Sequence, residues 1–132
     1  MFGTIVRASN SYLTDNKGSV IGISIRESKF NDMTILNKFK RIVAINLSDN
    51  DIHDINISNL PDLRFIKIFE DNEYRTLTKI KNVDKLAFFE VWGLNSPNFK
   101  KFTGVEGLRK IKIISMGIES FDGLENMPNL KE

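Results

Sequence analysis

The sequence contains no cysteine, one histidine and one tryptophan among its 132 residues. The lack of cysteine excludes a disulfide framework and any thiolate metal site. Because His53 is the only imidazole, a metal centre with several histidines is excluded and any histidine-based triad is limited to this residue. No glycine-rich phosphate loop is present either. We therefore expect neither enzyme activity nor a cofactor.

The chain also lacks long apolar runs and an excess of one charge. No run approaches the roughly 20 apolar residues that a membrane-spanning helix needs, so no membrane span is expected. The 19 basic and 17 acidic residues give a net charge of +2, too small for a strong field toward nucleic acid. With 41% hydrophobic residues, the composition is typical of one soluble globular domain. The sequence leaves open whether the protein is cytoplasmic or exported.

An internal repeat of 21 to 23 residues covers most of the chain. Its markers are Val20, Ile42, Leu63, Leu86, Leu108 and Leu130. The last complete turn has apolar residues at Leu108, Ile111, Ile113, Met116, Ile118, Phe121, Leu124 and Met127. The earlier turns match this pattern, with one residue deleted from the second and one inserted in the third, except at Ser28, Asn50, Asp71 and Ser96.

The spacing within each turn predicts a short strand followed by a return segment. The first apolar residues after each marker alternate with polar ones, which indicates a strand with one inward face. Strands that recur once per turn of a coil lie parallel, and we expect them near residues 22–26, 44–48, 65–69, 88–92 and 110–114. Later apolar residues recur every three positions, which favours a 3₁₀-like or extended return. The predicted inward residues are Ile45, Leu47, Ile66, Ile68, Phe89, Val91, Ile111 and Ile113.

The second turn resembles the leucine-rich-repeat motif LxxLxLxxNxL, in the segment from Ile42 through Asn50 to Ile52. The period and the threefold return look like the bacterial, internalin-like class of this family. The resemblance implies an α/β, right-handed solenoid with a parallel sheet on its concave face and 3₁₀ or extended returns on its convex face. It also implies non-enzymatic protein binding. The solenoid would span residues 20–132, with five turns and the beginning of a sixth, within a single domain.

Residues 1–19 do not continue the repeat and are interpreted as an N-terminal cap. The segment from Phe2 to Ala8 alternates as a strand does, and Asp15 to Gly18 has the residues of a tight turn. Such a cap would cover the open end of the core.

The outward positions of the predicted strands place an aromatic group on the third and fourth turns. Neighbouring strands lie about 4.8 Å apart, so these rings would form one compact patch, large enough for a partner protein. Self-association, a carbohydrate ligand, rings that merely stack on one another and a register error remain open alternatives. The predicted binding residues are Phe65, Phe69, Phe88, Trp92, Ile114, Lys67 and Glu90.

Two charged groups have a simpler interpretation than a ligand site. Asp49, Asp51 and Asp54 could surround a calcium ion, but they lack the glycine and distal glutamate of a calcium loop, so a solvated turn is favoured. Basic residues towards the C-terminal turns could suit single-stranded nucleic acid beside aromatic rings. A solvated face is favoured here too, and no nucleic-acid partner is predicted. These basic residues are Lys100, Lys101, Arg109, Lys110 and Lys112.

The fifth turn is the most apolar, and Leu130 begins another. A solenoid end normally becomes polar because an open end exposes core side chains and unpaired strand groups. We therefore expect the edge near Ile111, Ile113 and Ile118 to be covered, either by a longer array or by another copy in a homo-oligomer.

Overall fold

The fold is known from a computed structural model, which describes residues 10–28, 31–50, 54–56, 60–69, 79–81, 85–93, 96–114 and 117–131. Side chains are described for all of these except 54–56 and 79–81. Of the predicted cap, only the part from Asn10 onward lies within the described residues.

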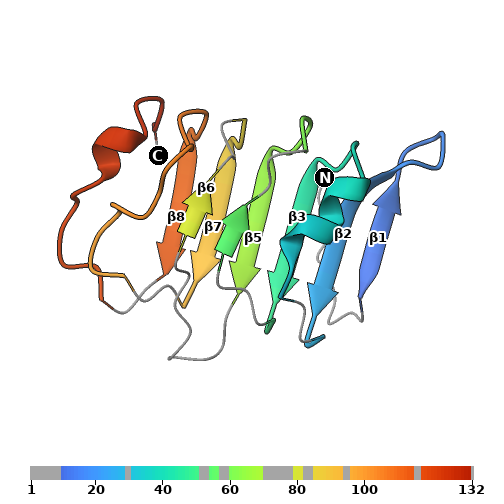
Figure 1. Ribbon diagram of the computed structural model, residues 1–132, viewed down its shortest axis with the longest axis horizontal. Coiled ribbons are helices and arrows are strands. Elements are labelled where there is room, and N and C mark those ends of the chain that lie inside the picture. The colour runs from blue at the N-terminus through green and yellow to red at the C-terminus, as the bar shows by residue number, and fades with distance from the viewer. Residues whose placement is uncertain are drawn as a thin grey trace.

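The main feature is an open six-stranded sheet, shown in Figure 1. All neighbouring strands in it are parallel except the first pair, β1 and β2, which is antiparallel. In spatial order the strands are β1 (Ser11–Thr14), β2 (Val20–Arg26), β3 (Ala44–Ser48), β5 (Phe65–Phe69), β7 (Phe88–Trp92) and β8 (Lys110–Ile114). The five strands predicted from the repeat are therefore present and parallel.

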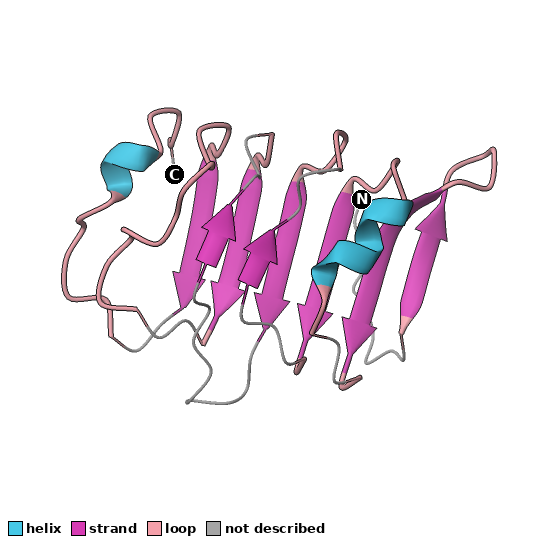
Figure 2. Ribbon diagram, viewed as in Figure 1, coloured by secondary structure: helices cyan, strands magenta, loops and turns pink. Residues whose placement is uncertain are grey.

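A second layer lies over one side of this sheet. It contains two short parallel strands, β4 (Asp54–Asn56) and β6 (Lys79–Lys81), and the 3₁₀ helix η1 (Met33–Lys38). Figures 1 and 2 show these elements in front of the large sheet, with a second 3₁₀ helix, η2 (Leu124–Asn126), near the β8 end. The expectation of 3₁₀ or extended returns holds in these segments. Neither described helix has the length and apolar character that a membrane crossing requires.

The turn between β1 and β2 is formed by the residues that predicted it, Asp15 to Gly18. The Asp15 carboxylate accepts the backbone N–H groups of Lys17 at 2.8 Å and Ser19 at 2.9 Å. Gly18 has φ +79°, a left-handed conformation that glycine adopts without steric cost. Strand β1, which this turn joins to β2, was not predicted, because its sequence Ser-Tyr-Leu-Thr does not alternate.

The residue after a strand adopts the same unusual conformation at three places in the sheet. Glu27, Asp49 and Gly93 have φ values of 49°, 52° and 80°. Their N–H groups donate to the carbonyls of Ser48, Phe69 and Ile114, the last residues of the next strands. Strands β2, β3 and β7 therefore each end in a turn that is hydrogen-bonded to the next strand, and these three turns share one geometry.

One hydrophobic cluster lies between the sheet and the second layer. The first six predicted inward residues, from Ile45 to Val91, are at most 2% exposed. Ile111 and Ile113, which were also predicted to be buried, are only half-buried. They lie on β8, an outer strand of the sheet, so their inner sides lack a further strand to pack against.

Asn50, the asparagine of the segment from Ile42 to Ile52, is fully buried and spans two turns. Its side-chain amide donates to the carbonyls of Ile25 at 2.9 Å and Ser48 at 3.0 Å. Its side-chain oxygen accepts the Ser28 hydroxyl at 2.9 Å. Ser28 occupies the equivalent position one turn earlier and is exposed, so an exposed hydroxyl and two backbone carbonyls satisfy the buried Asn50 side chain.

Candidate functional site

The sheet has an outward face, formed by the alternate strand residues that point away from the core. Because the five parallel strands pair without a register shift, these residues form three straight rows across the sheet. The first row is Gly22, Ala44, Phe65, Phe88 and Lys110. The second is Ser24, Asn46, Lys67, Glu90 and Lys112. The third is Arg26, Ser48, Phe69, Trp92 and Ile114.

Five apolar residues of this face, which we call the aromatic block, lie on β5, β7 and β8. Phe65 is 43% exposed and Ile114 is 42% exposed, whereas Phe69, Phe88 and Trp92 are half-buried. The rings form two tilted pairs, with centroids 6.4 Å apart for Phe65–Phe88 and 5.7 Å apart for Phe69–Trp92. The structure thus places the four rings on the predicted side of the sheet, but as two ring pairs with the charged row Lys67–Glu90–Lys112 between them rather than as one compact patch.

Glu90 lies at the centre of this face and is only 8% exposed. One of its carboxylate oxygens accepts the indole N–H of Trp92 at 2.6 Å. The ammonium groups of Lys67 and Lys112 approach the same oxygen, each at 3.4 Å. Sequence reasoning assigned Glu90 to the patch but missed this network, although the register row Lys67–Glu90–Lys112 contains the signal.

Opposing effects act on the Glu90 carboxyl. Burial is the largest of them and raises its pKa. The Trp92 hydrogen bond and the charges of Lys67 and Lys112 together outweigh burial, so the pKa of Glu90 lies below its usual range. The buried side chain is therefore ionised at neutral pH.

The two lysines also contact the tryptophan ring. The ammonium nitrogens of Lys67 and Lys112 lie 5.9 Å and 5.3 Å from the Trp92 ring centroid, within the range of cation–π attraction. Glu90 thus orients the indole through its N–H, while the lysines contact the ring. These contacts hold the indole ring of Trp92 in one orientation on the sheet face.

The basic residues predicted as one cluster separate in the structure. Lys110 and Lys112 are exposed on the outward face. Lys100 instead pairs with Asp122 at 2.9 Å in the return segment, and this pairing raises the pKa of Lys100. Lys101 is partly buried, which lowers its pKa. Of these residues, Lys110 and Lys112 therefore lie on the same sheet face as the aromatic block.

The N-terminal half of the outward face has a different character. Its side chains are small or polar, and Asn46 donates to the Ser24 hydroxyl at 3.4 Å. Its one cation, Arg26, lies 3.1 Å from a Glu27 carboxylate oxygen and 3.7 Å from an Asp49 one. This half offers neither an apolar anchor nor a cation without nearby carboxylates.

The catalytic and calcium candidates gain no support from geometry. His53 and Asp51 lie outside the described residues, as does the Asp54 side chain. In the described part of the chain, no three histidine, aspartate or glutamate side chains gather closely enough to hold a metal ion. Asp49 instead lies beside Arg26.

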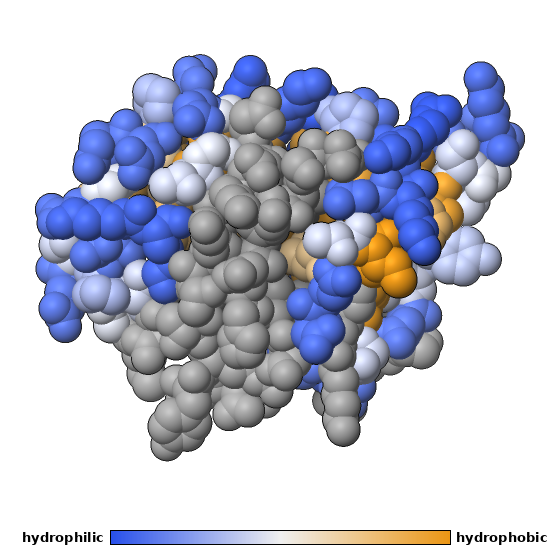
Figure 3. Space-filling model, in the orientation of Figure 1, coloured by the Kyte–Doolittle hydropathy of each residue, from blue (hydrophilic) through white to orange (hydrophobic). Residues whose placement is uncertain are grey.

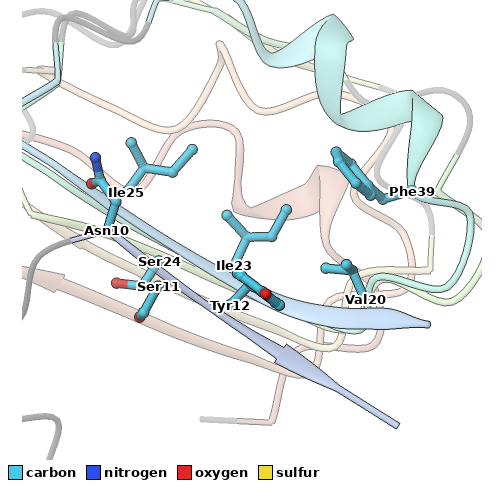
Figure 4. A pocket seen from close by; sticks show the side chains of 8 residues that line it. All are labelled: Asn10, Ser11, Tyr12, Val20, Ile23, Ser24, Ile25 and Phe39. Carbon is cyan, nitrogen blue, oxygen red and sulfur yellow. The ribbon is translucent and has the colours of Figure 1, made fainter. Parts of the chain in front are cut away.

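A hollow lies at the β1 end of the core. Its volume is about 380 Å³, and Figure 4 shows Val20, Ile23 and Ile25 of β2 and Phe39 around it. The space-filling view has apolar surface at this end of the molecule (Figure 3). These β2 residues are half-buried, whereas their counterparts on β3 are buried. The hollow is the end of the core and has no group of titratable side chains for chemistry.

Comparisons with models of protein families, with curated proteins and with solved structures gave no match to this chain.

Proposed function

We propose that this protein is a leucine-rich-repeat solenoid that binds a partner protein, without catalysis, through the aromatic block. The observation that carries the proposal is the placement of Phe65, Phe69, Phe88, Trp92 and Ile114 on three neighbouring strands of one outward sheet face. The in-phase repeat and the unshifted parallel register support the solenoid assignment.

The size and composition of the block favour protein recognition. An aromatic side chain offers about 150–250 Å², so partial exposure of four rings and an isoleucine gives several hundred Å² of apolar surface. Patches of that size on soluble proteins mark interaction sites. Tryptophan and phenylalanine are enriched at interface centres, and a tryptophan already held by Glu90 loses little conformational freedom on binding.

The test compares two exposed phenylalanines. Phe65 belongs to the block, whereas Phe121 is 73% exposed in the return segment, where it stacks on Phe99. The wild-type protein, Phe65→Ala and Phe121→Ala are immobilised and used to capture proteins from an extract of the source cells. We expect a specific partner that Phe121→Ala retains and Phe65→Ala loses. Capture that is equal for all three proteins would place the binding site elsewhere.

A second candidate function is self-association through β8. This strand is at the end of the sheet order, its inward Ile111 and Ile113 stay half-exposed, and Ile114 is exposed on the outward face. Unpaired strand edges with apolar flanks promote pairing between chains. Sedimentation over a wide concentration range distinguishes the two: a concentration-dependent dimer that Ile111→Lys abolishes supports this candidate. A monomer at all concentrations rejects it.

A further inference from the structure

The outward face of the sheet carries an excess of positive charge. Its fifteen row positions contain four cations, Arg26, Lys67, Lys110 and Lys112, and one carboxylate, Glu90. The face therefore carries a formal charge of +3, whereas the whole chain carries only +2. The rest of the chain is slightly acidic, so the outward face is basic although the net charge of the whole chain is small.

Most of this charge surrounds the aromatic block. Arg26, at the far end of the face, lies beside Glu27 and Asp49. The three lysines instead lie on β5 and β8, on either side of the strand that carries Glu90. The ammonium groups of Lys67 and Lys112 both contact the same carboxylate oxygen of Glu90, so one negative charge faces two positive charges. Their side chains are 46% and 51% exposed, so their ammonium groups are accessible to a partner.

We propose that the partner segment bound by the aromatic block is acidic, with apolar side chains against the ring pairs Phe65–Phe88 and Phe69–Trp92 and carboxylates beside Lys67, Lys110 and Lys112. This inference rests on the proposed function and specifies its partner class. An ammonium group has three donors, and on Lys67 and Lys112 one of them is directed to Glu90. A carboxylate from the partner would use the remaining donors and offset the excess charge.

The same geometry argues against single-stranded nucleic acid. Bases bind by stacking on open aromatic faces. Here the rings are tilted against one another in pairs, and two ammonium groups lie against the Trp92 ring. An apolar side chain of a peptide needs no parallel stacking and can pack against tilted rings, so a peptide avoids this conflict.

The experiment begins with a phage-displayed library of random dodecapeptides, selected on the folded wild-type protein. The strongest peptides are synthesised with a fluorescent label, and their dissociation constants are measured by anisotropy. We expect enriched peptides to be net acidic and to contain an aromatic or large aliphatic residue. Phe65→Ala should abolish their binding. Enriched peptides that are neutral or basic but still need Phe65 would overturn the acidic inference and leave the proposed function standing.

Charge variants then test the lysines. Lys110→Glu should weaken the acidic peptides by about tenfold, and Lys67→Gln/Lys112→Gln should weaken them similarly, because each removes a charge contact. Lys17→Glu, an equal charge change in the exposed β1–β2 turn, is the control and should bind as the wild type does. Raising salt from about 50 to about 500 mM should weaken wild-type binding. Affinities that do not respond to any of these changes reject the inference.

Two other results have definite meanings. A labelled single-stranded oligothymidylate that binds more tightly than the acidic peptides would replace the proposed partner class with nucleic acid. A selection that enriches no peptide, or only peptides indifferent to Phe65→Ala, would count against the proposed function itself, and the acidic inference would fall with it. Circular dichroism confirms that each variant is folded.

Discussion

The two faces of the six-stranded sheet are built from alternate residues of the same strands, but their compositions follow different rules. On the inner face of β3 and β5 the residues are uniform: Ile45, Leu47, Ile66 and Ile68 are all aliphatic and at most 2% exposed. On the outward face the residues change from small and polar on β2 and β3 to aromatic on β5 and β7. Core packing requires apolar residues on the inner face, whereas the residues of the outward face can differ between strands.

The largest expected effect concerns Ile66, on the inner face of β5. Ile66→Ala should lower the free energy of unfolding by about 2–5 kcal/mol, because it leaves a cavity in a close-packed core. Chemical denaturation measures this loss. A variant as stable as the wild type would mean that the inner and outward faces have been exchanged.

The next prediction concerns Asn50, a buried polar residue next to the apolar core. Asn50→Ala should cost about 1–3 kcal/mol, because the carbonyls of Ile25 and Ser48 and the Ser28 hydroxyl lose a buried partner. Asn129→Ala, which removes one bond from an exposed amide to the Glu106 carbonyl, is the control and should cost less. Equal losses in the two variants would show that Asn50 does not hold adjacent turns together.

Glu90 tests the buried charge of the outward face. Since the pKa of its carboxyl is lowered from the ordinary 4.5 by folding, its ionised form stabilises the protein above that pH. This stability is lost as the pH falls through the lowered folded-state value. The melting temperature of the wild type should therefore exceed that of Glu90→Gln most at neutral pH, and the difference should shrink below about pH 4.

The control for this prediction is Glu106→Gln, which changes an exposed carboxyl away from the sheet face. It should leave the pH profile of the melting temperature close to that of the wild type. A difference between the wild type and Glu90→Gln that stays constant from neutral to acidic pH would contradict the proposed ionised network.

The smallest effect on stability is expected for Phe65, next to Ile66 on the same strand. Phe65→Ala should cost less than about 1.5 kcal/mol, because this ring is 43% exposed and loses mainly its contact with Phe88. Identical denaturant titrations of Phe65→Ala and Ile66→Ala compare the stability that one residue of each sheet face contributes. A loss as large as that of Ile66→Ala would assign Phe65 to the core rather than to a binding surface.

The strand positions could be predicted because the period of two and the repeat fix the same register independently. Ile66 and Ile68 needed only alternation to be placed inside. The half-burial of Ile111 and Ile113 could not be read from their own turn, because burial depends on whether a neighbouring strand is present. Strand β1 was missed since its pairing is decided by β2 and by the turn at Asp15, not by its own pattern.

The candidate site was predictable in its members but not in its interactions. The alternation of inward and outward residues along each strand is sufficient to place Phe65, Phe88 and Trp92 on one face. The short hydrogen bond from Trp92 to Glu90 depends on side-chain rotamers, and the burial of Glu90 depends on how the neighbouring lysines and rings cover it. Such effects arise between strands, and a single strand's sequence does not contain them.

The unshifted register has a consequence for how such a surface can evolve. Gly22, Ala44, Phe65 and Phe88 occupy one row, although 22, 21 and 23 residues separate them in turn along the chain. The gain or loss of a residue is therefore absorbed between the strands, and the grid of outward positions is preserved. Point substitutions on this grid and length changes in the connecting segments can accumulate separately. Outward residues can thus change while the connecting segments vary in length, and the same separation makes the grid a convenient target for engineered binding.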